Sequence, residues 1–274
     1  MTAARSNDIY PIIFQNLLLY RVHAFDNYPG LTHTIFTRVG GFSREPYQSL
    51  NLSISTGDNP AIVKKNFERA CHVVNIVPEQ TVSCRLVHGT DIVTVDKNNQ
   101  QPVMGQADGL ITDSTNIYLF MRFGDCTPLL FYDPVRGVVG STHAGWRGTM
   151  QNAAGATIGV MVNQFGCRPK NIVAVIGPAI GPCCYEVGPD VVSAAEQAFS
   201  DSKSLLIHHN GNGSRPYFDL WEANRRQLST AGVGKIIQTG LCTGCHTDKF
   251  FSHRAEHGRT GRFGTVIGLR REPG

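Results

Sequence analysis

Short apolar runs separated by polar turns recur along most of this chain, and they predict strands. These runs cover residues 31–38, 81–87, 91–95, 107–112, 117–123, 128–132, 137–142 and 172–176, with two more near Ile236 and Val266. Four stretches have apolar positions at helical spacing: 60–74 after a cap at Asp58 or Asn59, about 149–165 before Gly166, 189–199, and 219–232. Because no clean linker separates these elements, the pattern predicts one α+β domain, residues 1–274, with mixed sheets.

The segment 138–149, VVGSTHAGWRGT, combines a strand, a glycine-bounded turn and the start of a helix. The first N–H groups of a helix lie at the positive end of its dipole and attract anions such as phosphate. Arg147 adds a planar donor for the same anion. His143 ends the strand and has the chemistry of a metal ligand or a proton carrier. An ordinary strand–helix connection that buries a histidine and a tryptophan has the same pattern.

Composition and charge narrow the class of protein. Hydrophobic residues make up 41% and charged residues 17% of the 274 positions, which is enough apolar material for a sizeable core. The net charge of +4 favours anionic small molecules and is too small to indicate nucleic acid. Residues 9–22 are apolar on average, but polar residues and Pro11 interrupt them, which argues against a signal peptide. We therefore expect a cytoplasmic protein without a membrane partner, whose eight cysteines are thiols, metal ligands or core residues.

Three potential metal ligands stand at predicted strand ends beside glycine or proline: His88, Cys126 and His143. Two imidazoles and a thiolate suit Zn²⁺, and three protein ligands leave a fourth position open for water, as in catalytic zinc sites. Bound zinc would lower the pKa of that water to about 7. The residue types by themselves favour a core cysteine and two hydrogen-bonded histidines over a metal site, because the spacing is long.

Two other roles are open for the same segment. Asp125 is a candidate to orient a ligand, to act as a base or to cap a turn. If Cys126 is not a ligand, it is a candidate nucleophile with His88 or His143 as its base.

The sequence Cys242-Thr243-Gly244-Cys245-His246 matches the attachment pattern for c-type haem. That chemistry requires export, and no export signal is recognised here, so we do not expect haem. A second zinc site from Cys242, Cys245 and His246, with Cys183 or Cys184, is the alternative. A single CxxC without a partner CxxC is a weak signal for such a site.

Several arginines stand beside glycines at element ends. Arg254, Arg259 and Arg262 lie in the loop SHRAEHGRTGR near the C-terminus. Together with Arg38 and Arg147 they are candidates to clamp phosphate or another anion. A solvated basic loop is the simpler alternative, but three separate segments repeat the arrangement. Neither the P-loop nor the dinucleotide-binding glycine pattern occurs in the sequence.

The motifs, taken in order, resemble those of one family. They are TRVGGFS, SLNL, LVHGTDIV, ADGLIT, GDCTPLLFYDP, HAGWRGT, IGPAIGPCCYEVG, FDLWEAN and CT…FFSHR…GR. They are similar to the YfiH-like or laccase-domain proteins, described as multicopper polyphenol oxidases and also as purine nucleoside phosphorylases. The resemblance covers about residues 30–269.

The resemblance implies a four-layer α/β/β/α sandwich with mixed sheets. It implies a metal triad at His88, Cys126 and His143, and phosphorolysis of purine nucleosides to free base and ribose-1-phosphate. It also implies adenosine deamination. We expect zinc as cofactor, a purine nucleoside and phosphate as partners, and a monomer or homodimer. Assigning phosphate to Arg38, Arg147, Arg254 and Arg262 is our own interpretation of the arginine pattern.

The alternatives are a copper-dependent polyphenol oxidase and a cysteine hydrolase acting on cell-wall intermediates through Cys126. A laccase-type copper cluster needs many histidines, and the sequence has no paired His-x-His motif to supply them. The chain departs from the family pattern at Leu86, Gly124 and His253, where glutamine, alanine and tyrosine are usual. The three metal ligands are intact, so we expect metal binding to survive these changes.

Overall fold

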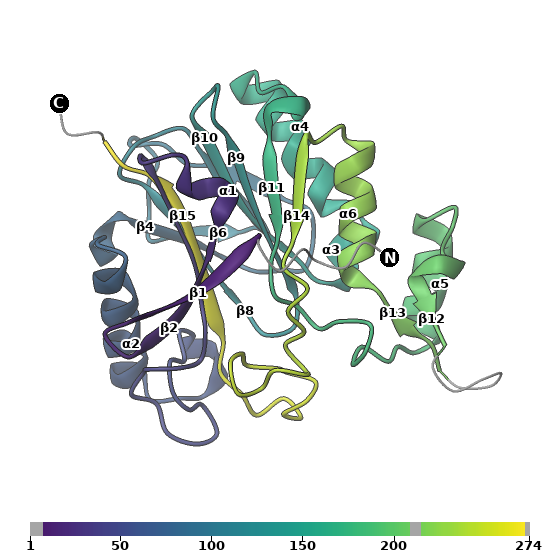
Figure 1. Ribbon diagram of the computed structural model, residues 1–274, viewed down its shortest axis with the longest axis horizontal. Helices are drawn as coiled ribbons and strands as arrows, with labels where there is room; N and C mark the ends of the chain where they lie inside the picture. Colours follow the sequence, from purple (N-terminus) through teal and green to yellow (C-terminus); the bar gives the residue numbers. More distant parts are fainter. Residues whose placement is uncertain (1–7, 209–214, 272–274) are drawn as a thin grey trace.

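Two mixed β-sheets form the centre of the computed structural model, which describes residues 8–208 and 215–271 (Figure 1). The seven-stranded sheet contains β1 (Ile9–Phe14), β2 (Leu17–Val22), β3 (Leu31–Phe36), β4 (Thr81–Arg85), β6 (Val103–Gln106), β8 (Tyr118–Phe123) and β15 (Phe263–Leu269). The six-stranded sheet contains β5 (Ile92–Thr94), β7 (Gly109–Thr112), β9 (Thr127–Asp133), β10 (Val138–Ala144), β11 (Val173–Ile176) and β14 (Lys235–Gln238). Their orders are β1-β2-β3-β15-β8-β4-β6 and β14-β11-β9-β10-β7-β5. Both sheets mix parallel and antiparallel pairs, as predicted.

Helices cover the outer faces of the two sheets. The α-helices are α1 (His23–Asp26), α2 (Pro60–Val73), α3 (Trp146–Met150), α4 (Ala153–Phe165), α5 (Pro189–Ala198) and α6 (Leu220–Thr230). Short 3₁₀ turns at Ile54–Thr56, Pro78–Gln80, Pro169–Asn171 and Lys203–Leu205 and the ladder of β12 (Leu206–Ile207) with β13 (Tyr217–Phe218) complete the elements. Figure 1 shows α2 beside one sheet and α4 and α6 beside the other. None of the helices in the described ranges has the length and apolarity to cross a membrane.

Alternation along the central strands explains the layers, because successive strand residues point to opposite faces of a sheet. In β8, Leu119 packs between the sheets, whereas Phe120 packs toward α2. In β9, Leu130 packs between the sheets, whereas Phe131 packs toward α4 and α6. The strands are therefore apolar on both faces, and the order of layers is helix, sheet, sheet, helix. This confirms the predicted α+β class and mixed four-layer sandwich; a single domain over residues 1–274 stays a prediction.

The sequence reading missed the N-terminal hairpin. Residues 9–22 form β1 and β2, joined by Gln15 and Asn16 with φ of 48° and 64°. Positive φ at both residues is the geometry of the turns that join two-residue hairpins, although asparagine–glycine is the usual signal. The polar residues Gln15 and Asn16, which interrupt the apolar run, are the turn itself. The short strand β6 was also not predicted, because three of its four residues are exposed and it lies outside the apolar runs.

The helix expected after Gly148 is two helices. Residues 146–150 form the short α3, and α4 begins after Asn152, whose φ is 65° and whose side chain accepts a hydrogen bond from the Gly155 N–H. The predicted apolar face is otherwise correct, because Ala153, Ala154, Thr157, Ile158 and Met161 of α4 are buried. Arg147 therefore belongs to a five-residue helix rather than to the N-terminus of a long one.

Candidate metal centre

His88, Cys126 and His143 converge where the chain passes between the two sheets. His88 lies in the turn after β4, Cys126 lies between β8 and β9, and His143 is near the end of β10. Their ligand atoms all lie within 4.8 Å of one another. The rings of His88 and His143 meet edge to face with centroids 4.9 Å apart. These three side chains, which are far apart in the sequence, thus form one potential metal site with three ligands.

Strand pairing explains how Cys126 meets His143. β9 and β10 are antiparallel, and His143 and Ala144 lie opposite Pro128 and Thr127. Cys126 comes directly before Thr127, so it stands beside the last residues of β10. Hairpin register alone therefore brings a thiol and an imidazole together.

Asp108 positions His88 and His143 through hydrogen bonds. Its fully buried carboxylate accepts hydrogen bonds from the N–H groups of His88 and Gly89, at 2.9 and 2.6 Å. The same carboxylate lies 3.0 Å from Nδ1 of His143, and the backbone oxygen of Asp108 accepts the His143 N–H at 2.7 Å. An ionised carboxylate can only accept, so Nδ1 carries the proton and Nε2 is free to bind a metal. Sequence reasoning gave Asp108 no role, although it belongs to the ADGLIT motif.

The charges in the site favour a thiolate. Burial raises the pKa of Cys126, but the positive charge of His143 and hydrogen bonds from both histidines outweigh it and lower the pKa to about 6. Burial lowers the pKa of His143, but Cys126 and Asp108 outweigh it and raise the pKa to about 9. Without metal, Cys126 and His143 are therefore a thiolate–imidazolium pair near neutral pH.

Because Gly145 has no side chain, the space beside the three candidate ligands stays open. A Cβ at this position would lie 3.0 Å from Sγ of Cys126, 3.2 Å from Cδ2 of His88 and 3.5 Å from Cε1 of His143. Any side chain here would displace the ligands or occupy the place of an ion. Two imidazole nitrogens and one sulfur suit zinc and leave one coordination position open. The residues present therefore fit a divalent metal ion.

Two of the candidate arginines lie next to the Asp125–Cys126 segment. Burial lowers the pKa of Arg262, opposed by the nearby charges of Cys126 and Asp125. A Cβ on Gly124 would lie 2.9 Å from Cδ of Arg262, so alanine at this position would require the Arg262 side chain to shift. Arg254 donates its backbone N–H to Oδ2 of Asp125 at 2.7 Å. The guanidiniums of Arg254 and Arg262 donate to the backbone oxygens of Glu186 and Gly261, at 2.6 and 2.8 Å.

Of the four arginines assigned to phosphate, Arg38 and Arg147 remain. Arg38 pairs with Glu256 at 2.8 Å and donates to the backbone oxygens of Gln48 and Thr247 at 2.7 and 2.8 Å. Much of its guanidinium is therefore occupied by the protein. Arg147 is exposed and its guanidinium lies over the Trp146 ring, 4.4 Å from the centroid.

Asp125 anchors the loops around the site. Its φ is 85°, and its carboxylate accepts hydrogen bonds from the Thr243 hydroxyl at 2.6 Å and from the Arg254 N–H at 2.7 Å. Its backbone oxygen accepts the Ile180 N–H at 2.9 Å. Three separate loops therefore meet at Asp125, and its role in orienting a ligand stays a prediction.

Comparison with known proteins identifies the family. Residues 32–270 match the family model described as multi-copper polyphenol oxidoreductase laccase. The chain belongs to this family. The relatives it resembles carry the name of an enzyme, purine nucleoside phosphorylase.

Individual relatives match over nearly the whole chain. The purine nucleoside phosphorylase YlmD of Geobacillus stearothermophilus is 37% identical over 254 residues, covering 89% of this chain and 92% of that protein. The crystal structure of YlmD from that organism superposes with a TM-score of 0.86 at 36% identity, covering 95% of this chain and 100% of that one. The hypothetical protein YfiH of Bacillus licheniformis gives a TM-score of 0.86 at 32% identity, covering 94% and 97%. These structures share the mixed α+β fold described above.

Proposed function

We propose that this protein is a zinc-dependent purine nucleoside phosphorylase. The observation that carries the proposal is the convergence of His88, Cys126 and His143 within 4.8 Å, in a chain whose relatives are named purine nucleoside phosphorylases. Inosine, adenosine or guanosine and phosphate would be converted to the purine base and ribose-1-phosphate.

The arginines supply the phosphate site in this proposal. In phosphorolysis a phosphate oxygen bonds to C1′ of the ribose, while the bond from C1′ to the purine nitrogen breaks and the purine leaves with its electron pair and gains a proton. Arg254 and Arg262, beside the Asp125–Cys126 segment, would hold the phosphate with help from Arg38 and Arg147. Fixing the phosphate next to C1′ lowers the barrier by positioning, and cations offset the charge of the anion.

The metal ligands have a separate role. His88, Cys126 and His143 would hold zinc, with Asp108 orienting His143 and the backbone of His88. When bound, zinc would act as a Lewis acid toward the substrate. The same chemistry would serve a second activity, the deamination of adenosine, in which water replaces the exocyclic amine and ammonia leaves.

A cysteine hydrolase is the second candidate, and one observation favours it. The pKa of Cys126 is lowered to about 6 beside His143, which is the condition of an activated nucleophile. In that reading Cys126 attacks the substrate carbonyl and His143 donates the proton to the leaving group. The metal-ligand and nucleophile roles make opposite predictions for metal content after substitution of Cys126.

The decisive experiment combines metal analysis with nucleoside assays. Protein purified without added metal is assayed with inosine in the presence and absence of phosphate. We expect stoichiometric hypoxanthine and ribose-1-phosphate, no base release without phosphate, and zinc rather than copper in the protein. Cys126→Ser should lose both zinc from this centre and activity, whereas Asp113→Asn, at an exposed position, should retain both.

Three outcomes would contradict the proposal. Base release that is independent of phosphate would exclude phosphorolysis. Copper at this centre with oxidation of phenols would support the oxidase instead. Cys126→Ser that keeps its metal at His88 and His143 but loses activity would identify a nucleophile.

A further inference from the structure

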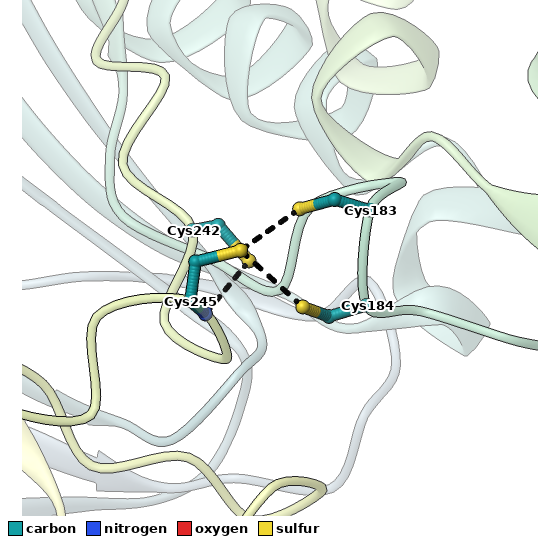
Figure 2. A group of neighbouring side chains, drawn as sticks. All are labelled: Cys183, Cys184, Cys242 and Cys245. Atoms are coloured by element: carbon teal, nitrogen blue, oxygen red, sulfur yellow. Dashed lines mark hydrogen bonds between the residues drawn. The ribbon is translucent and has the colours of Figure 1, made fainter.

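A second group of sulfur atoms lies where two loops leave one edge of the six-stranded sheet. β11 and β14 are parallel neighbours, so the loops that follow them start side by side. Ala179 in the first loop pairs with Cys242 in the second as an isolated β-bridge. Figure 2 shows the result: Cys183 and Cys184 of the first loop face Cys242 and Cys245 of the second. The four Sγ atoms all lie within 4.8 Å of one another.

The spacing of the sulfur atoms is that of ligands around one ion. Sγ of Cys245 lies 3.3 Å from Sγ of Cys183 and 3.4 Å from Sγ of Cys184. Four sulfurs at about 2.3 Å from a tetrahedral zinc ion are roughly 3.8 Å apart, whereas a disulfide requires about 2.05 Å. Small side-chain rotations would therefore complete a tetrahedron.

Backbone N–H groups around Cys242 donate hydrogen bonds that stabilise a thiolate. Sγ of Cys242 accepts the N–H groups of Gly181 and Cys245 at 3.2 and 3.4 Å, although Cys242 itself is buried. Such N–H donors are typical of the partners that stabilise metal-bound sulfur. A Cβ on Gly244 would lie 2.9 Å from Cβ and 3.1 Å from Sγ of Cys184, so glycine is what allows the loops to come this close.

We infer that Cys183, Cys184, Cys242 and Cys245 bind one zinc ion in a closed, structural site. Four thiolates leave no open position, which distinguishes this site from the His88–Cys126–His143 centre. The sequence had suggested His246 with only one of the adjacent cysteines. In the structure both adjacent cysteines join the cluster and His246 does not. Nδ1 of His246 lies 4.0 Å from Oδ1 of Asp248 instead.

The proposed ion would fasten the two loops that support the first centre. Thr243, between the two cysteines of its loop, donates to Asp125 at 2.6 Å, and Ile180 of the other loop donates its N–H to the Asp125 oxygen at 2.9 Å. The cysteine cluster is therefore connected to Cys126 through Asp125. Its existence is independent of the reaction proposed above.

The test removes the first centre and asks what the protein still binds. The variant His88→Ala/His143→Ala is purified and its metal is measured, and Co²⁺ is then exchanged into it. We expect one equivalent of zinc per chain and a cobalt spectrum with intense thiolate-to-metal charge-transfer bands and strong tetrahedral d–d bands. Adding Cys184→Ser and Cys245→Ser to this variant should abolish the bound zinc and the cobalt spectrum. Adding Cys84→Ser, outside the cluster, should change neither the zinc content nor the spectrum.

Each other result overturns the inference. A His88→Ala/His143→Ala variant without bound metal, or with a disulfide within the cluster found by mass spectrometry of the alkylated protein, excludes a zinc tetrathiolate. Stoichiometric iron with visible absorption excludes zinc as the metal. If the cysteine variants do not fold, the cobalt spectrum of the histidine variant decides alone, because a site with fewer thiolates has weaker charge-transfer bands.

Discussion

At the scale of single residues, Asp108 determines the geometry of the candidate metal centre. It is fully buried, and hydrogen bonds from His143 and from the N–H groups of Gly89 and His88 lower its pKa in spite of the opposing effect of burial. The carboxylate is thus ionised and positions two of the three ligands. Partners of metal-bound histidines typically contribute about 10–100-fold to metal affinity.

Replacing Asp108 should weaken metal binding without removing a ligand. Asp108→Asn keeps the shape but loses one acceptor and the negative charge beside His143, so we expect zinc affinity to fall by about 10–100-fold. Competition with a chromogenic chelator measures this change. The measurement uses protein that also carries Cys184→Ser and Cys245→Ser, so that zinc binds only at the His88–Cys126–His143 centre. The exposed Asp113→Asn is the control and should bind zinc normally. Equal affinities of the two variants would show that Asp108 has no positioning role.

The charge pair of Cys126 and His143 makes metal binding depend on pH. Between about pH 6 and 9 the Cys126–His143 pair carries one titratable proton, on His143, because the pKa values of the pair are about 6 and about 9. Zinc must displace that proton, so its affinity should rise about tenfold for each pH unit from 7 to 8.5 and level off above 9. Chelator competition at several pH values measures the slope. A flat profile would contradict the imidazolium assignment.

At the scale of elements, the turn between β10 and α3 packs closely against the candidate metal ligands. Gly145→Ala would place a Cβ 3.0 Å from Sγ of Cys126 and 3.2 Å from the His88 ring. We expect this variant to fold but to lose zinc at the centre, measured by metal analysis and circular dichroism. Gly159→Ala in α4 is the matched control, because nothing lies within 4 Å of its Cβ. That control should keep zinc and gain up to about 1 kcal/mol of stability. Full zinc occupancy in Gly145→Ala would show that the ligands tolerate a side chain there.

At the scale of the whole molecule, β15 joins the two ends of the chain. It lies between β3, from the N-terminal part, and β8, and Ile267 on β15 is fully buried in the cluster between the sheets. Residues of both sheets, such as Leu119 and Val139, belong to that cluster. The core between the sheets therefore depends on contacts that are distant in sequence.

Ile267→Ala should destabilise the fold as a whole. Removing three buried carbon atoms creates a cavity in the central core, and we expect a loss of about 2–5 kcal/mol in the free energy of unfolding. Urea denaturation measures it. Val135→Ala, at a side chain that is 70% exposed, should change the free energy by less than about 0.5 kcal/mol. Similar losses for the two variants would contradict the placement of β15 in the core.

Features that arise from neighbouring residues could be predicted from the amino-acid sequence. Asn59, one of the two predicted caps, accepts a hydrogen bond from the Ala61 N–H at 2.9 Å and caps α2. Asp219 caps α6 by accepting the Glu222 N–H at 3.0 Å. The apolar runs of β8 and β9 marked central strands because both of their faces are buried. The family resemblance supplied the layers and the ligand triad, which the residue types by themselves did not favour.

Contacts between side chains that are distant in sequence became visible only in the folded protein. The role of Asp108, the occupied guanidinium of Arg38 and the replacement of His246 by a fourth cysteine all depend on strand order and register. Parallel pairing of β11 with β14 places four cysteines together, and antiparallel pairing of β9 with β10 places Cys126 beside His143. Local sequence fixes backbone preference over a few residues, whereas these contacts depend on how the two sheets are assembled and packed. That assembly is set by burial of the whole core, and no single segment encodes it.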